Sequence, residues 1–94
     1  MKSILQTEKE CYICGSPYVE EHHIFYGTSN RKNSERTGLK VYLCPYHHRG
    51  QGGVHHAGNK SLDLELKRIA QRKFEETHTR EEFMRIFGQN YIDE

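Results

Sequence analysis

Hydrophobic positions in the last third of the chain recur at steps of three and four residues, the spacing of one face of a helix. They are Leu62, Leu66, Ile69, Ala70 and Phe74. This pattern predicts a helix over the segment, and either Asn59 or Ser61 is suited to cap its N-terminus.

A second helix is predicted from a start signal further along the chain. Thr79 and Glu82 are three residues apart, as the N-cap and N3 residues of a capping box are. An apolar side follows, made by Phe83, Met84, Ile86 and Phe87. Gly88 is placed to end this helix. Both helices are expected to cover a core built by the middle of the chain.

The middle of the chain predicts two short strands. Residues 19–26 are rich in β-forming side chains, and residues 39–43 (LKVYL) alternate apolar and polar positions. Residues 27–30 (GTSN) predict a turn-rich exit from the first strand. We therefore expect one small α+β domain. It would consist of a flexible lead-in (residues 1–10), a core (11–60) and C-terminal helices (61–94) that pack on the core.

Composition adds the need for a further source of stability. Only 34% of the 94 residues are hydrophobic, below the typical share of about 45–50%. Three cysteines, an odd number that includes a Cys-x-x-Cys pair, suit a metal site better than disulfides. No secretory signal or membrane-spanning stretch is visible, so we expect a cytoplasmic protein without a membrane partner, in which the thiols stay reduced.

The cysteines form a pattern that is typical of a structural zinc site. Cys11-x-x-Cys14 and Cys44-x-x-His47 are separated by 29 residues, and each two-residue gap lets both of its ligands reach one tetrahedral ion. A site of three cysteines and one histidine has no open position, which indicates a structural role. His48 is an alternative fourth ligand, but the two-residue gap favours His47.

Three adjacent histidine pairs surround this pattern: His22-His23, His47-His48 and His55-His56. Hydrolysis of a phosphodiester needs a base that activates water and a cation that neutralises charge, and a neutral histidine can be the base at physiological pH. Adjacent side chains on a strand point to opposite faces. The first pair can therefore share one site only if the strand ends or bulges there.

The net charge of +1 does not by itself indicate a nucleic-acid partner. Basic residues nevertheless gather between Tyr26 and Arg49, where the only acidic residue is Glu35. They are Arg31, Lys32, Arg36, Lys40 and Arg49. A basic segment beside a polar cluster fits contact with DNA phosphates. An ordinary solvated loop fits the charge pattern equally well.

Taken in order, these motifs resemble a known family. Cys-x-x-Cys, Glu-His-His, a basic loop and Leu-Cys-x-x-His-His resemble the HNH nucleases, also called His-Me finger or ββα-metal nucleases, that carry a zinc staple. More narrowly, the chain is similar to phage-borne recombination-enhancement, RecA-dependent nucleases. The resemblance spans roughly residues 11–56, and residues 62–91 also look like the tail of small phage proteins in that group.

The resemblance implies a fold, an activity and a role for several residues. The fold would be a ββα-metal finger followed by two helices, and the activity metal-dependent cleavage of DNA with Mg²⁺ or Mn²⁺. His22 and His48 would be ligands of the catalytic cation, with His55 as a rival or additional ligand. His23 would be the general base. A recombinase filament is a candidate partner, and a phage protein would act in the host cytoplasm.

One departure from the family pattern, and one run of glycines, leave alternatives open. The asparagine of HNH, which orients the base, is absent from residues 37–39 (TGL), so Asn30, Asn33 or a backbone carbonyl would hold His23. Glycines between His48 and His55 argue against one continuous helix, so a turn must bring these two histidines together.

Two other functions compete with the nuclease. One is a non-catalytic zinc finger that binds nucleic acid or a recombination protein; it would use the basic segment and tolerate loss of His23. The other is a structural domain that binds a partner through its helical tail. The histidines beyond the zinc site favour the nuclease, since neither alternative needs them.

Overall fold

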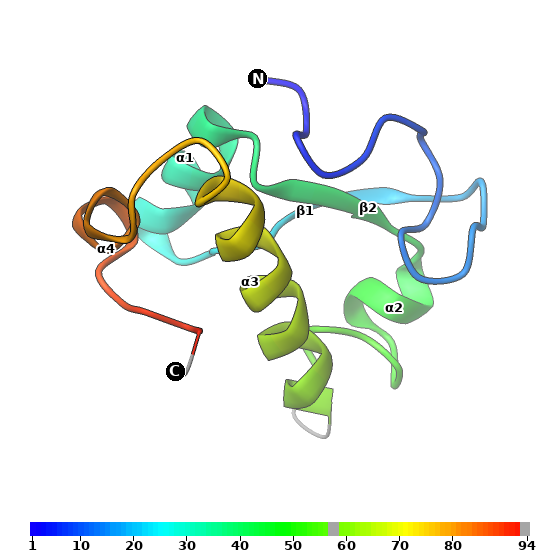
Figure 1. Ribbon diagram of the computed structural model, residues 1–94. Coiled ribbons are helices and arrows are strands. Elements are labelled where there is room, and N and C mark those ends of the chain that lie inside the picture. Colours follow the sequence, from blue (N-terminus) through cyan, green and yellow to red (C-terminus); the bar gives the residue numbers. More distant parts are fainter. Residues whose placement is uncertain (57–58, 93–94) are drawn as a thin grey trace.

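The computed structural model describes residues 1–56 and 59–92. The elements are β1 (Glu20–His23), α1 (Thr28–Thr37), β2 (Lys40–Leu43), α2 (Pro45–Arg49), α3 (Lys60–Phe74) and α4 (Arg80–Phe87) (Figure 1). Over these residues the protein is an α+β structure with one two-stranded sheet and four helices, which confirms the predicted class.

The two strands pair antiparallel, with His22 opposite Val41 and His23 opposite Lys40. Both strands are shorter than predicted. β1 ends at His23 because only one bond forms in the next pair: Ile24 N–H donates to the carbonyl of Leu39, at 3.1 Å, but Leu39 N–H donates to the carbonyl of Ser34, at 3.0 Å, and not back to Ile24. The end of the predicted first strand therefore becomes part of the core.

Between the strands the structure has a ten-residue helix, α1, where the sequence predicted a turn-rich segment. This helix has almost no apolar face, and Ser34 is its one buried residue. Polar contacts fix it in place. The amide groups of Asn30 and Asn33 donate to the carbonyls of Phe87 and Ile86, at 3.4 and 3.0 Å. α1 is therefore stabilised by the end of α4, which lies about 50 residues further along the chain.

The two predicted C-terminal helices are confirmed. Thr79 and Glu82 form the capping box of α4, and Gly88 ends it in a left-handed conformation. Asn59 occupies the N-cap position of α3, but its side-chain amide donates to the carbonyl of Gly52 and makes no cap bond. α3 crosses one face of the sheet (Figure 1), and the core joins residues of this helix to those of β2: Leu66, Ala70, Phe74, Val41 and Leu43.

The lead-in, residues 1–10, forms no helix or strand, but it lies along the outer edge of β2. Ile4 N–H donates to the carbonyl of Gly38 at 3.0 Å, and the side-chain oxygen of Gln6 accepts from Tyr42 N–H at 2.9 Å. These bonds cover an edge that would otherwise expose unpaired backbone groups. Among the described helices, none has the length and apolar character needed to cross a membrane.

Candidate metal centres

The four residues predicted to hold zinc lie together at one end of the sheet. Their ligand atoms, three sulfurs and the Nδ1 of His47, all lie within 4.8 Å of one another. Cys14 and Cys44 Sγ are 3.8 Å apart, and Nδ1 of His47 is 3.2 Å from Cys44 Sγ and 3.8 Å from Cys11 Sγ. A tetrahedral zinc site with Zn–S bonds of about 2.3 Å separates its sulfurs by about 3.8 Å. The group Cys11, Cys14, Cys44 and His47 could therefore hold a metal ion.

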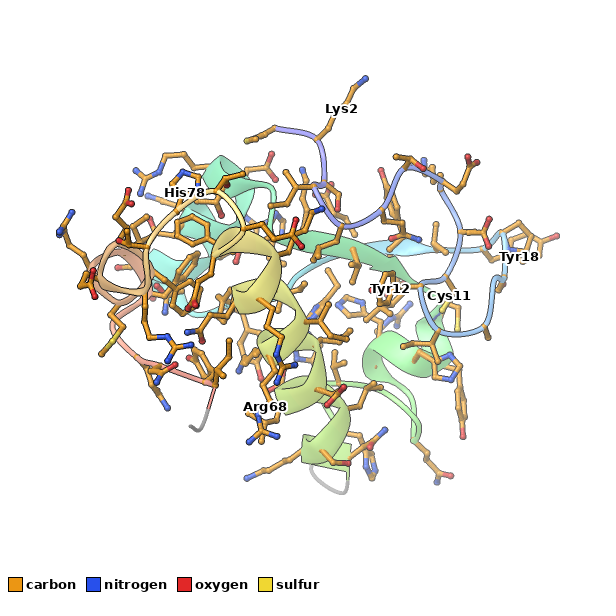
Figure 2. The ribbon with its side chains drawn as sticks, viewed as in Figure 1. Lys2, Cys11, Tyr12, Tyr18, Arg68 and His78 are labelled. Carbon is orange, nitrogen blue, oxygen red and sulfur yellow. The ribbon has the colours of Figure 1, made fainter. Side chains whose placement is uncertain are left out.

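Local backbone structure positions these ligands. A tight turn brings Gly15 N–H to the carbonyl of Cys11, at 2.8 Å, so both cysteines of the first pair point to one place. Cys44 is the N-cap of α2, and His47 lies on the first turn of that helix. Figure 2 shows Cys11 next to α2. Burial raises the pKa of the Cys11 thiol, but hydrogen bonds from the backbone outweigh it and lower that pKa to about 6, which favours the thiolate that ligates metal.

A second group joins three histidines from three parts of the chain: His22 of β1, His48 of α2 and His55 of the loop that follows. Their candidate ligand nitrogens all lie within 4.8 Å of one another. The ring centroids are 5.2 Å apart for His22 and His48, 5.2 Å for His22 and His55, and 5.0 Å for His48 and His55. We call this group the three-histidine cluster. The structure thus places His48 here, and His47 in the cysteine group.

A turn, and not a helix, brings His55 back to His48, as the glycines predicted. Val54 and His55 N–H donate to the carbonyls of His47 and His48, at 3.0 and 3.3 Å. The chain passes so close to α2 that a Cβ on Gly53 would lie 2.8 Å from the backbone of His48 and Arg49. Only glycine fits there without a shift of the backbone.

The chemistry of the three-histidine cluster fits a cation. His22 is 2% exposed, and its Nε2 has no hydrogen-bond partner among the described residues. Burial lowers the pKa of His22 to about 3, with a further contribution from the neighbouring His48 and His55. The ring is therefore neutral at physiological pH. A buried imidazole nitrogen without a partner is unfavourable unless something accepts its lone pair, and a metal ion does so.

Glu20, which the sequence prediction missed, orients one ring of this cluster. Its Oε1 lies 2.7 Å from Nδ1 of His48. A carboxylate only accepts, so Nδ1 carries the proton and Nε2 remains free as a ligand. Arg49 and then His48 lower the pKa of Glu20 to about 2 through their hydrogen bonds. Strand alternation could have revealed this residue, because Glu20 is two positions before His22 and on the same face.

His23 lies on the other face of the sheet. Its Nε2 is 2.8 Å from Oε1 of Glu35 and 3.6 Å from Oε1 of Glu21. The two strands pair in regular register through His23, so β1 neither bulges nor ends before it. The condition under which His22 and His23 could share one site is therefore not met. The role of His23 as a general base stays a prediction.

The partner of His23 differs from the candidates that the sequence suggested. Asn30 and Asn33 are bonded to the end of α4, so neither of them orients His23. Glu35 of α1 takes this position. Its one visible signal in the sequence is that it is the sole acidic residue among the basic residues between the strands.

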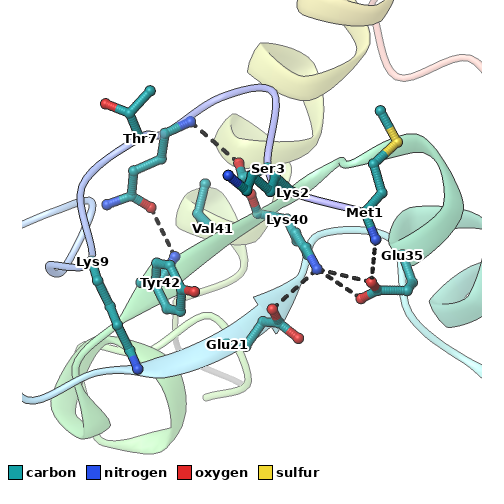
Figure 3. Close-up of a pocket in the computed structure, with 11 residues that line it drawn as sticks. Met1, Lys2, Ser3, Thr7, Lys9, Glu21, Glu35, Lys40, Val41 and Tyr42 are labelled. Carbon is teal, nitrogen blue, oxygen red and sulfur yellow. Dashed lines mark hydrogen bonds and ion pairs between the residues drawn. The ribbon is translucent and has the colours of Figure 1, made fainter.

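Lys40, which was predicted to contact DNA phosphate, lies among charged side chains. Its side chain is 10% exposed, and its ammonium lies 2.9 Å from both oxygens of Glu35 and 3.1 Å from Glu21 (Figure 3). These residues line a pocket of about 630 Å³ under the lead-in. Two carboxylates thus pair with Lys40, and its contact with a DNA phosphate stays a prediction. Arg31, Lys32 and Arg36 are exposed on α1, and their contact with phosphate stays a prediction.

Comparison with protein-family models, with curated proteins and with solved structures gives no match for this chain.

Proposed function

We propose that this protein is a metal-dependent DNA endonuclease of the HNH type, with a ββα-metal finger held by zinc. The observation that carries the proposal is the three-histidine cluster, with its buried and unpartnered His22 Nε2, next to a separate cysteine-rich group. An antiparallel strand pair followed directly by α2 supports it further, since the ligands come from β1 and α2. The choice of DNA, the phage origin and the link to recombination rest on the sequence resemblance.

The two groups would divide the work between them. Cys11, Cys14, Cys44 and His47 would hold a structural zinc ion. The three-histidine cluster would hold the catalytic cation, which supplies charge neutralisation and water activation when bound. Three imidazoles suit a transition-metal ion better than Mg²⁺. We therefore expect Mn²⁺ to support more activity than Mg²⁺.

The test is cleavage of supercoiled plasmid by zinc-loaded protein, with Mg²⁺, with Mn²⁺ or with no added cation. Chelators are avoided because they would also remove zinc. His22→Ala should lower the rate by more than the roughly 10- to 100-fold that follows loss of an outer-shell partner. The matched control is His78→Ala, because His78 lies far from Cys11 and α2, near the turn between α3 and α4 (Figure 2).

His23→Ala in the same assay tests the predicted base. A loss as large as that of His22→Ala would support His23 as the base, although its side chain is on the opposite face from the cluster. Unchanged cleavage would remove it from that role. If the folded, zinc-loaded wild type binds DNA but cuts none, with or without a recombinase filament, the nuclease proposal fails and the zinc-containing binding module replaces it.

A further inference from the structure

A second pocket opens directly beside the three-histidine cluster. It has a volume of about 550 Å³, and His55 belongs both to its wall and to the cluster. Tyr26, just after β1, and Asp63, on the first turn of α3, form other parts of the wall. This volume is within the range of about 300–1,000 Å³ that is usual for small-ligand sites. The size and position fit one component of a substrate whose reacting bond lies at the cluster.

The aromatic wall of this pocket is held in a fixed position. Tyr26 is 41% exposed and lines the pocket, so part of its ring is open to a ligand. The ammonium of Lys67 lies 4.5 Å from the ring centroid, and the ring of His55 meets it nearly edge-on at 5.0 Å. Lys67 is itself held by Asp63 at 2.8 Å. An exposed aromatic ring with fixed neighbours is a platform on which a planar base can stack.

The polar groups of the pocket complement a nucleotide. Lys60 is exposed at its rim and offers a positive charge to a phosphate. Asp63 also lines the pocket, but its side chain is largely buried and paired with Lys67, and its Oδ1 is buried without a hydrogen-bond partner among the residues that the structure describes. Lys67 balances the charge of Asp63, so this carboxylate does not repel a nucleic acid as strongly as an isolated one would.

We propose that this pocket binds an unpaired nucleobase next to the scissile phosphodiester, stacked on Tyr26. The inference rests on the proposed nuclease function and specifies its substrate. A base inside a duplex is stacked and paired, so it can enter the pocket only if it is flipped out. The protein would therefore act on single-stranded or locally opened DNA.

The test measures binding and not cleavage. The zinc-loaded protein, without Mg²⁺ or Mn²⁺, is titrated into a labelled single-stranded oligodeoxynucleotide and into the duplex of the same sequence, with fluorescence anisotropy as the readout. Tyr26→Leu should weaken single-strand binding by about tenfold, within the range known for loss of one base–aromatic stack. Tyr26→Phe keeps the ring and should bind like wild type. Tyr18→Leu is the control, because Tyr18 is 79% exposed and lies between Cys14 and β1, away from the pocket.

A second readout places the fluorescent probe in the DNA. A single strand that contains 2-aminopurine should lose fluorescence on binding wild type, since stacking on tyrosine quenches this base, and should keep it on binding Tyr26→Leu. Equal binding of wild type and Tyr26→Leu, or tighter binding of duplex than of single strand, would overturn the proposal. These outcomes are separate from those of the plasmid assay. If the protein binds single strands through Tyr26 but does not cut plasmid, only the nuclease proposal fails. If it cuts plasmid but its binding does not depend on Tyr26, only the base pocket fails.

Discussion

At the scale of single residues, the alternation of side chains along β1 decides which polar residues lie on which face of the sheet. Glu20 and His22 face the three-histidine cluster, while Glu21 and His23 face Lys40 and Glu35. The sequence identified the histidines, because unusual residues in a β-forming run are visible without a structure. It could not assign their faces, because that assignment depends on where the strand ends. One alternating strand thus carries two separate polar groups.

Removal of Glu20 should weaken the cation site without unfolding the protein. Glu20→Ala leaves Nδ1–H of His48 without its acceptor, so the ring loses both orientation and basicity, and cation affinity should fall about 10- to 100-fold. Glu20→Gln keeps an acceptor oxygen and should lose less. The measurement is the Mn²⁺ concentration for half-maximal cleavage or for half-saturation in a metal-binding titration. Glu65→Ala, on the exposed face of α3, is the control. An unchanged half-saturation for Glu20→Ala would contradict this role.

At the scale of elements, the prediction was accurate where apolar periodicity or a cap is strong. α3 has apolar residues at helical spacing, and α4 has an apolar side and a capping box. The structure confirms both helices. α1 has neither: Gly27 precedes it without a side-chain cap, and only Ser34 is buried. Its helix depends on hydrogen bonds to Phe25 and to the end of α4. Such contacts leave no local pattern in the sequence, so the sequence predicted only a turn-rich segment at residues 27–30 and no helix.

The loop that brings His55 back to His48 after α2 should depend on Gly53. In Gly53→Ala the new Cβ would lie 2.8 Å from the backbone of His48 and Arg49, so the loop must move and carry His55 with it. We expect a loss of about 1–3 kcal/mol in the free energy of unfolding, as for overpacking elsewhere, together with weaker Mn²⁺ binding and full zinc content. Thermal unfolding and metal analysis measure both. Gln51→Ala, exposed in the same loop, should behave like wild type; a Gly53→Ala protein that does the same would refute this account.

At the scale of the whole molecule, a small core and a cysteine-rich group occur together. Aromatic contacts concentrate around Phe25, whose ring lies 5.3 Å from that of Phe83 and 4.5 Å from that of Phe87. This part of the core joins α4 to the end of β1. The other end of the sheet, with residues 11–19 and α2, has few such contacts, and there the four zinc-ligand candidates lie. The low apolar content predicted this arrangement in outline, because a thin core needs another source of stability.

Zinc removal should therefore unfold the protein. Binding of a structural zinc ion contributes about 10–16 kcal/mol in small zinc domains, as much as the total stability of a typical domain, about 5–15 kcal/mol. Cys11→Ser, or dialysis against a chelator, should abolish the far-ultraviolet circular dichroism of the folded state. Omission of Mg²⁺ and Mn²⁺ alone should leave that signal unchanged. A zinc-free protein that keeps its fold would show that the cysteine group does not stabilise it.

His47 and His48 are consecutive residues of one short helix, and each belongs to a different metal group. α2 has no buried residue of its own, so its place depends on the candidate zinc ligands at its start and on the bonds of His48 and Arg49 to Glu20. Oxidation of Cys11, Cys14 or Cys44 would convert a thiolate ligand into a group that no longer holds the ion. α2 would then lose one of its attachments, and the position of His48 beside His22 and His55 would be less well fixed. Oxidation of the cysteine group would in this way weaken cation binding by the three-histidine cluster, which itself contains no sulfur. Reduction of the thiols and resupply of zinc would restore that binding.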